Sequence, residues 1–302
     1  MSALPPFAAL LAEVEGFFER LPDKPEENPE LVLRCLWLLA AGRPVPVTRA
    51  AAVDLPDLAP AELDRLRSLL QRKREGTPLA HLTGRQEFLG LELLAGPEAL
   101  IPRKETEIVG RAAIAKLRER AASAPALTVI DVCTGSGNLA LAFAFHEPKA
   151  RVFASDLSPE AISLARRNAE FTGLASRIQF RQGDFLAPFE SPDLLGRCDL
   201  LSCNPPYISA GKVTKMPREI SGHEPSLAFD GGPFGVSLLL RLLKEAPAFL
   251  KPDGVLCFEV GAGQGPSMEK QLRRLPWVQQ VETHADREGT VRALVATRGG
   301  TP

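Results

Sequence analysis

The 302-residue chain lacks several features that would place it in a functional class at once. It has no excess of one charge: 36 lysines and arginines face 37 aspartates and glutamates, so no overall basic field is available to hold a nucleic-acid backbone. It has no apolar run near the roughly 20 residues of a membrane span, since stretches such as Leu36–Ala41 are far too short. The first residues also lack the basic and apolar pattern of a signal peptide. We therefore expect a soluble, cytoplasmic protein.

Paired metal ligands and paired thiols are missing as well. The five cysteines are scattered and form no C-x-x-C motif, and the four histidines show neither metal spacing nor a partner nucleophile. We expect no disulfide framework and no metal site. What is present is an ordinary globular composition, 45% apolar and 24% charged, which is enough for a full-sized core.

Hydrophobic periodicity and proline positions divide the chain into three parts. Residues 1–75 place apolar side chains at helical spacing between proline-containing breaks, which predicts a small helical domain. Residues 76–103 hold four glycines between short apolar runs, which predicts a hairpin linker. Residues 104–302 alternate strand and helix, which predicts a mostly parallel α/β sheet covered on both faces. No helix separates the last two strands, near 278–283 and 292–297, so the last strand should be antiparallel.

A glycine-containing turn from Asp131 to Asn138 follows the first buried strand of this sheet. Gly135 and Gly137 let a ligand approach the backbone closely, and doubly wound folds bind ligands at the carboxyl ends of their strands. A dinucleotide fingerprint would need glycine at position 133, where Cys133 stands, which argues against NAD. A tight turn without any ligand remains the alternative for this segment alone.

Two further strand ends carry residues that suit an adenosine. Asp156 could accept both hydroxyl hydrogens of a ribose. Asp184 could accept a hydrogen of the adenine amino group, and Phe185 could lie against the ring. Taken alone, each of these residues could equally be part of a helix cap or a polar turn that binds no ligand. Together, and with no basic phosphate clamp, they indicate an adenosine ligand without phosphate, such as S-adenosylmethionine.

The segment Asn204–Tyr207 reads Asn-Pro-Pro-Tyr at the end of the fourth predicted strand. Two prolines fix the backbone and remove two amide donors. The Asn204 side-chain oxygen and the Pro205 carbonyl could then accept the hydrogens of one planar NH2 group, with Tyr207 on its face. Such a site catalyses by positioning and electrostatics, since asparagine is no general base near neutral pH. The alternative is a proline-rich turn without a catalytic role.

These segments together resemble class I S-adenosylmethionine-dependent methyltransferases that act on planar nitrogens. Further stretches of the chain resemble the release-factor glutamine methyltransferases: Leu82–Phe88, Leu100–Glu107, His223–Pro225, Gly231–Gly232, and Glu259–Gly261 with Gln264. The resemblance implies a Rossmann-like methyltransferase sheet after a small N-terminal helical domain that binds the protein substrate. It also implies transfer of a methyl group from S-adenosyl-L-methionine to the side-chain nitrogen of a glutamine. That glutamine belongs to the Gly-Gly-Gln motif of a peptide chain release factor.

The resemblance also assigns roles to residues, in a protein that we expect to be monomeric and free of metal. The catalytic residues are Asn204, Pro205 and Tyr207. The cofactor-binding residues are Asp131, Cys133, Thr134, Gly135, Ser136, Gly137, Asp156, Leu157, Asp184, Phe185 and Asn204. The substrate-binding residues are Asn204, Pro205, Pro206, Tyr207, Pro102, Arg103 and Glu107.

Four positions depart from the pattern of that family. Cys133 replaces the usual first glycine, Lys104 a proline, Phe234 an aspartate and Leu239 a tyrosine. The first two lie near the expected cofactor site, where a shifted turn would lower affinity, and the last two leave room for a paralogue that modifies another protein. Two other interpretations stay open. A DNA or RNA amino methyltransferase would share the Asn-Pro-Pro-Tyr turn but would need a basic face, and a non-catalytic adenosine binder would share the cofactor turn.

Overall fold

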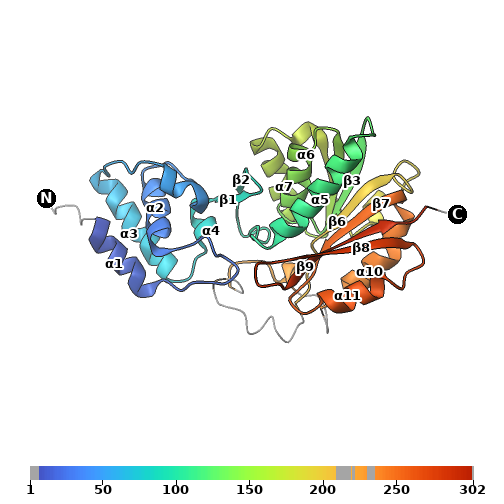
Figure 1. Cartoon of the computed structure of the whole chain (residues 1–302). Coiled ribbons are helices and arrows are strands. Elements are labelled where there is room, and N and C mark those ends of the chain that lie inside the picture. Colours follow the sequence, from blue (N-terminus) through green and yellow to red (C-terminus); the bar gives the residue numbers. More distant parts are fainter. Residues whose placement is uncertain (1–6, 209–218, 220–221, 230–234, 301–302) are drawn as a thin grey trace.

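The computed structural model describes residues 7–208, 219, 222–229 and 235–300, and its elements lie in three groups (Figure 1). Gly231, Gly232 and Phe234 fall outside these ranges. The first group packs around a separate apolar core that includes Leu33, Leu36 and Leu66. Its helices are α1 (Phe7–Phe17), α2 (Pro29–Ala40), α3 (Pro60–Arg74) and α4 (Leu79–Thr83). No helix within the described ranges is long and apolar enough to cross a membrane.

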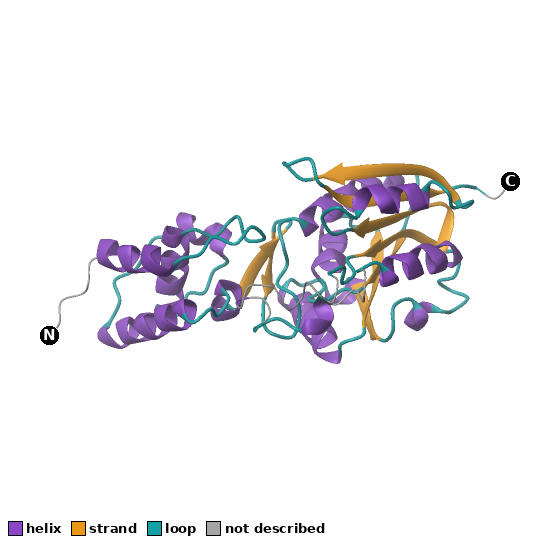
Figure 2. Ribbon diagram, turned by 90° about the horizontal axis from the view of Figure 1, so that it is seen from below, coloured by secondary structure: helices purple, strands orange, loops and turns teal. Residues whose placement is uncertain are grey.

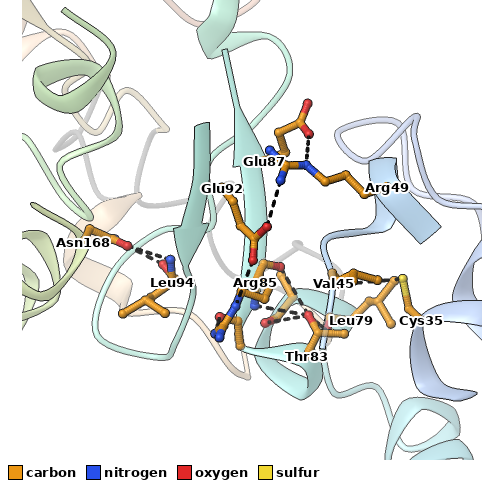
Figure 3. Close-up of polar contacts among 12 residues, drawn as sticks. Cys35, Val45, Arg49, Leu79, Thr83, Arg85, Glu87, Glu92, Leu94 and Asn168 are labelled. Carbon is orange, nitrogen blue, oxygen red and sulfur yellow. Dashed lines mark hydrogen bonds and ion pairs between the residues drawn. The ribbon is translucent and has the colours of Figure 1, made fainter. Parts of the chain in front are cut away.

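A two-stranded hairpin lies between this helical group and the large sheet (Figure 2). Its strands β1 (Arg85–Phe88) and β2 (Leu91–Leu94) pair antiparallel. Figure 3 shows how polar contacts fix the hairpin on both sides. Arg49 of the helical group pairs with Glu87 and Glu92, and the Asn168 side chain accepts a 2.6 Å hydrogen bond from the Leu94 amide. The hairpin therefore connects the two larger groups through specific contacts.

The third group is built on a seven-stranded sheet with the order β5-β4-β3-β6-β7-β9-β8. The first five strands in this order run parallel, and β9 is antiparallel to both β7 and β8. The predicted mostly parallel sheet with an antiparallel last strand is confirmed. The strands are β3 (Leu127–Val132), β4 (Ala150–Asp156), β5 (Ile178–Gln182), β6 (Cys198–Cys203), β7 (Leu250–Glu259), β8 (Val278–Ala285) and β9 (Val291–Arg298).

Helices cover both faces of this sheet. The helices α5 (Thr106–Ala121), α6 (Asn138–His146) and α7 (Pro159–Phe171) lie on one face, and α10 (Ser237–Glu245) and α11 (Gly265–Leu272) on the other (Figure 1). Val129 and Leu200 belong to the first core, whereas their neighbours Ile130 and Leu201 belong to the second. Because successive side chains of a strand point to opposite faces, burial on both faces requires the continuous apolar runs of these strands.

Capping side chains and prolines determine where these helices begin and end. Ser158 caps α7, since its hydroxyl accepts a 3.1 Å hydrogen bond from the Ala161 amide. Helix α10 ends at Glu245, and a 3-10 turn follows over Ala246–Ala248. The reason is Pro247, which has no amide hydrogen to continue the helix.

Candidate active site

The carboxyl ends of β3, β4, β5 and β6 line a cavity of about 530 Å³, which we call the strand-end cavity. This is the edge at which doubly wound sheets bind ligands. Most of the residues predicted from the sequence meet here. Those that line the cavity are Pro102, Arg103, Cys133, Thr134, Gly135, Ser136, Asp156, Leu157, Asp184, Phe185, Asn204 and Pro206.

The turn after β3 has an unusual backbone. Cys133 has a φ of 58°, Gly135 of 54° and Gly137 of 82°, all in the left-handed region. A side chain there costs about 1–2 kcal/mol, so a glycine would be less strained than Cys133 at the first position. Gly137 does not line the cavity. It is the N-cap residue of α6, and a β-carbon on it would lie 3.1 Å from that of Ala165.

Asp131 contacts the buried side of this turn and does not line the cavity. Its carboxylate is completely buried and accepts hydrogen bonds from the hydroxyls of Thr134, at 2.6 Å, and of Ser202. Burial raises the pKa of this carboxyl to about 6. Asp131 therefore holds Thr134 in place and makes no contact with the cavity.

Asp156, at the end of β4, faces the strand-end cavity with both oxygens partly used. One oxygen accepts a 2.8 Å hydrogen bond from the Gly135 amide and the other a 3.0 Å bond from the Ser158 amide. A carboxylate oxygen has a second lone pair, so each can still accept one hydrogen bond from a ligand. Burial raises the pKa of Asp156. This geometry suits the two neighbouring hydroxyls of a ribose.

Arg241 of α10 organises the third strand end and was not found from the sequence. Its Nη1 donates to both carboxylate oxygens of Asp184 at 2.8 Å, and its guanidinium lies 5.0 Å from the Phe185 ring centroid. One arginine thus orients both residues expected to contact adenine. Its position on an amphipathic helix gives no sequence signal for this contact.

Asn204 has a defined side-chain orientation. Its Nδ2 donates a 3.3 Å hydrogen bond to the hydroxyl of Thr106, a buried residue at the start of α5. The amide oxygen of Asn204 is therefore left to accept hydrogen bonds from a ligand. No motif in the sequence marks Thr106 for this role.

A second cavity of about 300 Å³, the tyrosine cavity, adjoins the first. Pro205, Tyr207, Glu259 and Arg292 contribute to its lining. Asn204 lies at the boundary, because it lines both cavities. The residues common to the two are Leu100, Arg103, Thr106, Asn204 and Ala228. A group bound in one cavity can therefore reach a group bound in the other beside Asn204.

Tyr207, the chain's single tyrosine, is held at both ends. Its hydroxyl donates a 2.9 Å hydrogen bond to Oε1 of the buried Glu259, and burial raises the pKa of this carboxyl to about 7. Gln264 donates from Nε2 to the main-chain oxygen of Tyr207 at 3.1 Å, while its own oxygen accepts from the Gly261 amide. Burial and Glu259 raise the pKa of Tyr207 as well. The tyrosine ring is thus fixed at the wall of its cavity.

Arg103 and Glu107, both expected to shape the site, lie in different places. Arg103 is buried between Asp23, 3.1 Å from its Nε, and Glu224, which accepts a hydrogen bond from its Nη2. Glu107 does not join the other predicted residues: it pairs with Lys104 and Arg111 and lines a separate cavity beside the hairpin. Its place on the first turn of α5 directs it toward the Leu89 amide.

Within the described ranges, no group of three or more histidine, cysteine, aspartate or glutamate side chains could hold a metal ion. The lining of the two cavities combines charged side chains, such as those of Asp156 and Glu259, with other hydrogen-bonding and apolar groups.

Comparison with known proteins finds relatives that match most of the chain. Residues 123–288 match the family model of a methyltransferase domain. A release factor glutamine methyltransferase of Moorella thermoacetica is 38% identical over 90% of this chain and 92% of that protein. One of Streptomyces coelicolor is 37% identical over 89% and 88%.

Solved structures agree on the fold. The catalytic domain of human Mettl16, in complex with a MAT2A 3′UTR hairpin, has a TM-score of 0.52 at 16% identity and covers 69% of this chain and 76% of that one. The N-terminal domain of human METTL16 in complex with SAH has a TM-score of 0.50 at 15% identity, with the same coverage. At such low identity the likeness concerns the fold alone.

Proposed function

The chain belongs to the release factor glutamine methyltransferases, and on that premise we propose that it methylates N5 of the glutamine in a release factor's Gly-Gly-Gln motif. The methyl donor is S-adenosyl-L-methionine. The position of Asn204, between the strand-end cavity and the tyrosine cavity, is the observation that carries the proposal. The cofactor binds in the first cavity and the glutamine side chain enters from the second.

The strand-end cavity fits this cofactor. Its volume of about 530 Å³ lies within the range of small-molecule sites. Asp156 has an unused lone pair on each oxygen for the ribose, and Phe185 supplies an aromatic surface for the adenine. When bound, S-adenosyl-L-methionine supplies an electrophilic methyl group on sulfur.

The protein's own residues prepare the nitrogen that attacks. Asn204 Oδ1 and the Pro205 carbonyl accept the two hydrogens of the glutamine carboxamide, which returns electron density to a nitrogen whose lone pair is delocalised. Thr106 keeps the Asn204 oxygen pointed at the substrate, and Tyr207 lies against the flat amide. Once the methyl group has arrived, the nitrogen has become acidic and gives its proton to water. Catalysis is therefore mainly positioning and preorganised electrostatics.

The helical segment at residues 1–75 serves in this proposal as the domain that binds the release factor. The hairpin at 76–103 links it to a methyltransferase domain at 104–302. The helical segment also contacts Glu219, between β6 and α10, because Lys24 and Lys73 both donate to its carboxylate, at 2.6 and 2.9 Å. The enzyme acts in the cytoplasm as a monomer.

Labelled methyl transfer tests the proposed function. A release factor incubated with the enzyme and labelled cofactor should gain one methyl group on the Gly-Gly-Gln glutamine, and the Gln→Ala factor should gain none. Asn204→Ala enzyme should still bind the cofactor but lose transfer, which a non-catalytic adenosine binder would not show. Label that survives the Gln→Ala change, or that appears on bare DNA or RNA instead, would contradict the proposal.

A further inference from the structure

Three buried polar atoms of residues that line the tyrosine cavity make no hydrogen bond among the described residues: Glu259 Oε2, Arg103 Nη1 and Arg292 Nε. Arg292 Nε lies 3.5 Å from a carboxylate oxygen of Asp286 in an ion pair, which leaves Glu259 Oε2 and Arg103 Nη1 as the two atoms without a polar partner. Their exposed fractions are only 2% and 6%. Unsatisfied buried groups of this kind are uncommon, because each costs about 1–3 kcal/mol. Two of them at one cavity indicate that an occupant completes the site.

The remaining atoms of both side chains are already engaged. Glu259 Oε1 accepts from Tyr207, while Arg103 gives its Nε to Asp23 and its Nη2 to Glu224. Thr106 faces the Glu259 carboxyl and lowers its pKa, but makes no hydrogen bond to Oε2. The cavity therefore offers one acceptor and one donor, each held in a fixed direction.

The charges around this cavity argue against an anionic occupant. The Arg103 guanidinium is already compensated by Asp23 and Glu224, and Arg292 is paired with Glu105. No free cation of the cavity lining is left for a phosphate or a carboxylate among the described residues. A main-chain peptide group is neutral and carries both an N–H and a carbonyl, so it matches the acceptor and the donor together.

We infer that this cavity binds the main chain beside the target glutamine: Glu259 Oε2 accepts a peptide N–H and Arg103 Nη1 donates to a peptide carbonyl. The inference rests on the proposed function, because it places the glutamine carboxamide at Asn204. A segment of small residues next to the glutamine lets the backbone come close enough, since no side chain has to fit between it and Tyr207. Glu259 and Arg103 thus form hydrogen bonds with the main chain of the substrate and not with one of its side chains.

Peptides with single amide-to-ester replacements test this inference on the unaltered enzyme. Synthetic peptides containing Gly-Gly-Gln are made with an ester in place of each amide next to the glutamine, one at a time, so that one N–H is removed. They are assayed at a pH above the Glu259 pKa of about 7, where the carboxylate is an acceptor. One ester should lower kcat/KM about tenfold, the size expected for a hydrogen bond to a charged group.

Glu259→Gln and Tyr207→Phe are the matched variants. In Glu259→Gln the same ester should change kcat/KM less than about twofold, because the charged acceptor is gone. In Tyr207→Phe the ester-specific loss should persist, because only the bond to Oε1 is removed. Cofactor binding by each variant shows that it is folded.

Two results would overturn the inference: no ester lowers kcat/KM by more than about twofold, or the loss is the same in Glu259→Gln. Either would mean that Glu259 acts only through Tyr207 or holds a water molecule. Failure of the proposed function looks different, because the all-amide peptide and the intact release factor would then both gain no methyl group on glutamine.

Discussion

Gly261 lies against the ring of Tyr207: a β-carbon on Gly261 would come within 2.9 Å of the ring atom Cδ2 and 3.1 Å of the Gln264 amide oxygen. Gly261→Ala therefore has to displace the tyrosine or the glutamine that holds its backbone. We expect methyl transfer to fall by about tenfold or more, with a loss of stability of about 1–3 kcal/mol. Cofactor affinity should change little, since Gly261 does not line the strand-end cavity.

Gly16→Ala is the matched control for this change. Gly16 lies in α1 and has no atom within 4 Å of the position of an added β-carbon. Alanine should stabilise the helix there by about 0.5–1 kcal/mol and leave transfer unchanged. Steady-state rates, cofactor titration and thermal unfolding of both variants measure these effects. Equal rates for Gly261→Ala and Gly16→Ala would show that the Tyr207 ring need not be fixed.

We expect the hydroxyl of Thr106 to raise the rate of methyl transfer. Thr106→Val keeps the shape but removes the acceptor for the Asn204 amide, so Asn204 can turn its nitrogen toward the substrate. A hydrogen bond worth about 1 kcal/mol predicts a fall in kcat of about fivefold. Thr106→Ser retains the hydroxyl and should restore most of the rate. A Thr106→Ser enzyme as slow as Thr106→Val would point to packing instead of orientation.

The buried Glu259 carboxyl predicts a pH-dependent stability. Its pKa is raised from an ordinary 4.5 to about 7. Between these values the folded state keeps a proton that the unfolded state has released, so the free energy of unfolding falls as pH rises through this window. The full loss is about 3 kcal/mol and persists above pH 7.

Comparison with Glu259→Gln isolates this group, because Asp131, with a pKa of about 6, also titrates in the window. The difference in unfolding free energy between wild type and Glu259→Gln should shift by about 3 kcal/mol in favour of the variant between acid and neutral pH. Denaturant unfolding at several pH values gives this difference. A difference that stays constant with pH would contradict the raised pKa.

Cys133 should be the thiol that reacts first. It is partly exposed and lines the strand-end cavity, whereas the other four cysteines are buried. Iodoacetamide should therefore modify Cys133 and block cofactor binding, and S-adenosyl-L-methionine should protect it. Peptide mapping by mass spectrometry follows the reaction, and Cys133→Ala provides the control. Fast modification of another cysteine, or no protection by the cofactor, would contradict the placement.

The sequence predicted the sheet and its turns because their signals are local. The local backbone conformation is set by nearby residues such as Pro205, Pro206, the glycines after β3 and the apolar runs of the strands. The contacts that orient the site are of another kind. Thr106 meets Asn204 across 98 positions of the chain and Arg241 meets Asp184 across 57, and no periodicity encodes such pairs. For Glu107 the local motif predicted a place in the site, but the side chain turns toward the hairpin and accepts a hydrogen bond from the Leu89 amide.

Arg103 is bound by carboxylates from two distant stretches, Asp23 near the start of the chain and Glu224 after β6. A chimera that takes its first helices from a relative must therefore bring an acid to position 23. Without it, the guanidinium is left with Glu224 alone, next to the tyrosine cavity. Exchanging the helical group would therefore be expected to change the rate of methyl transfer as well.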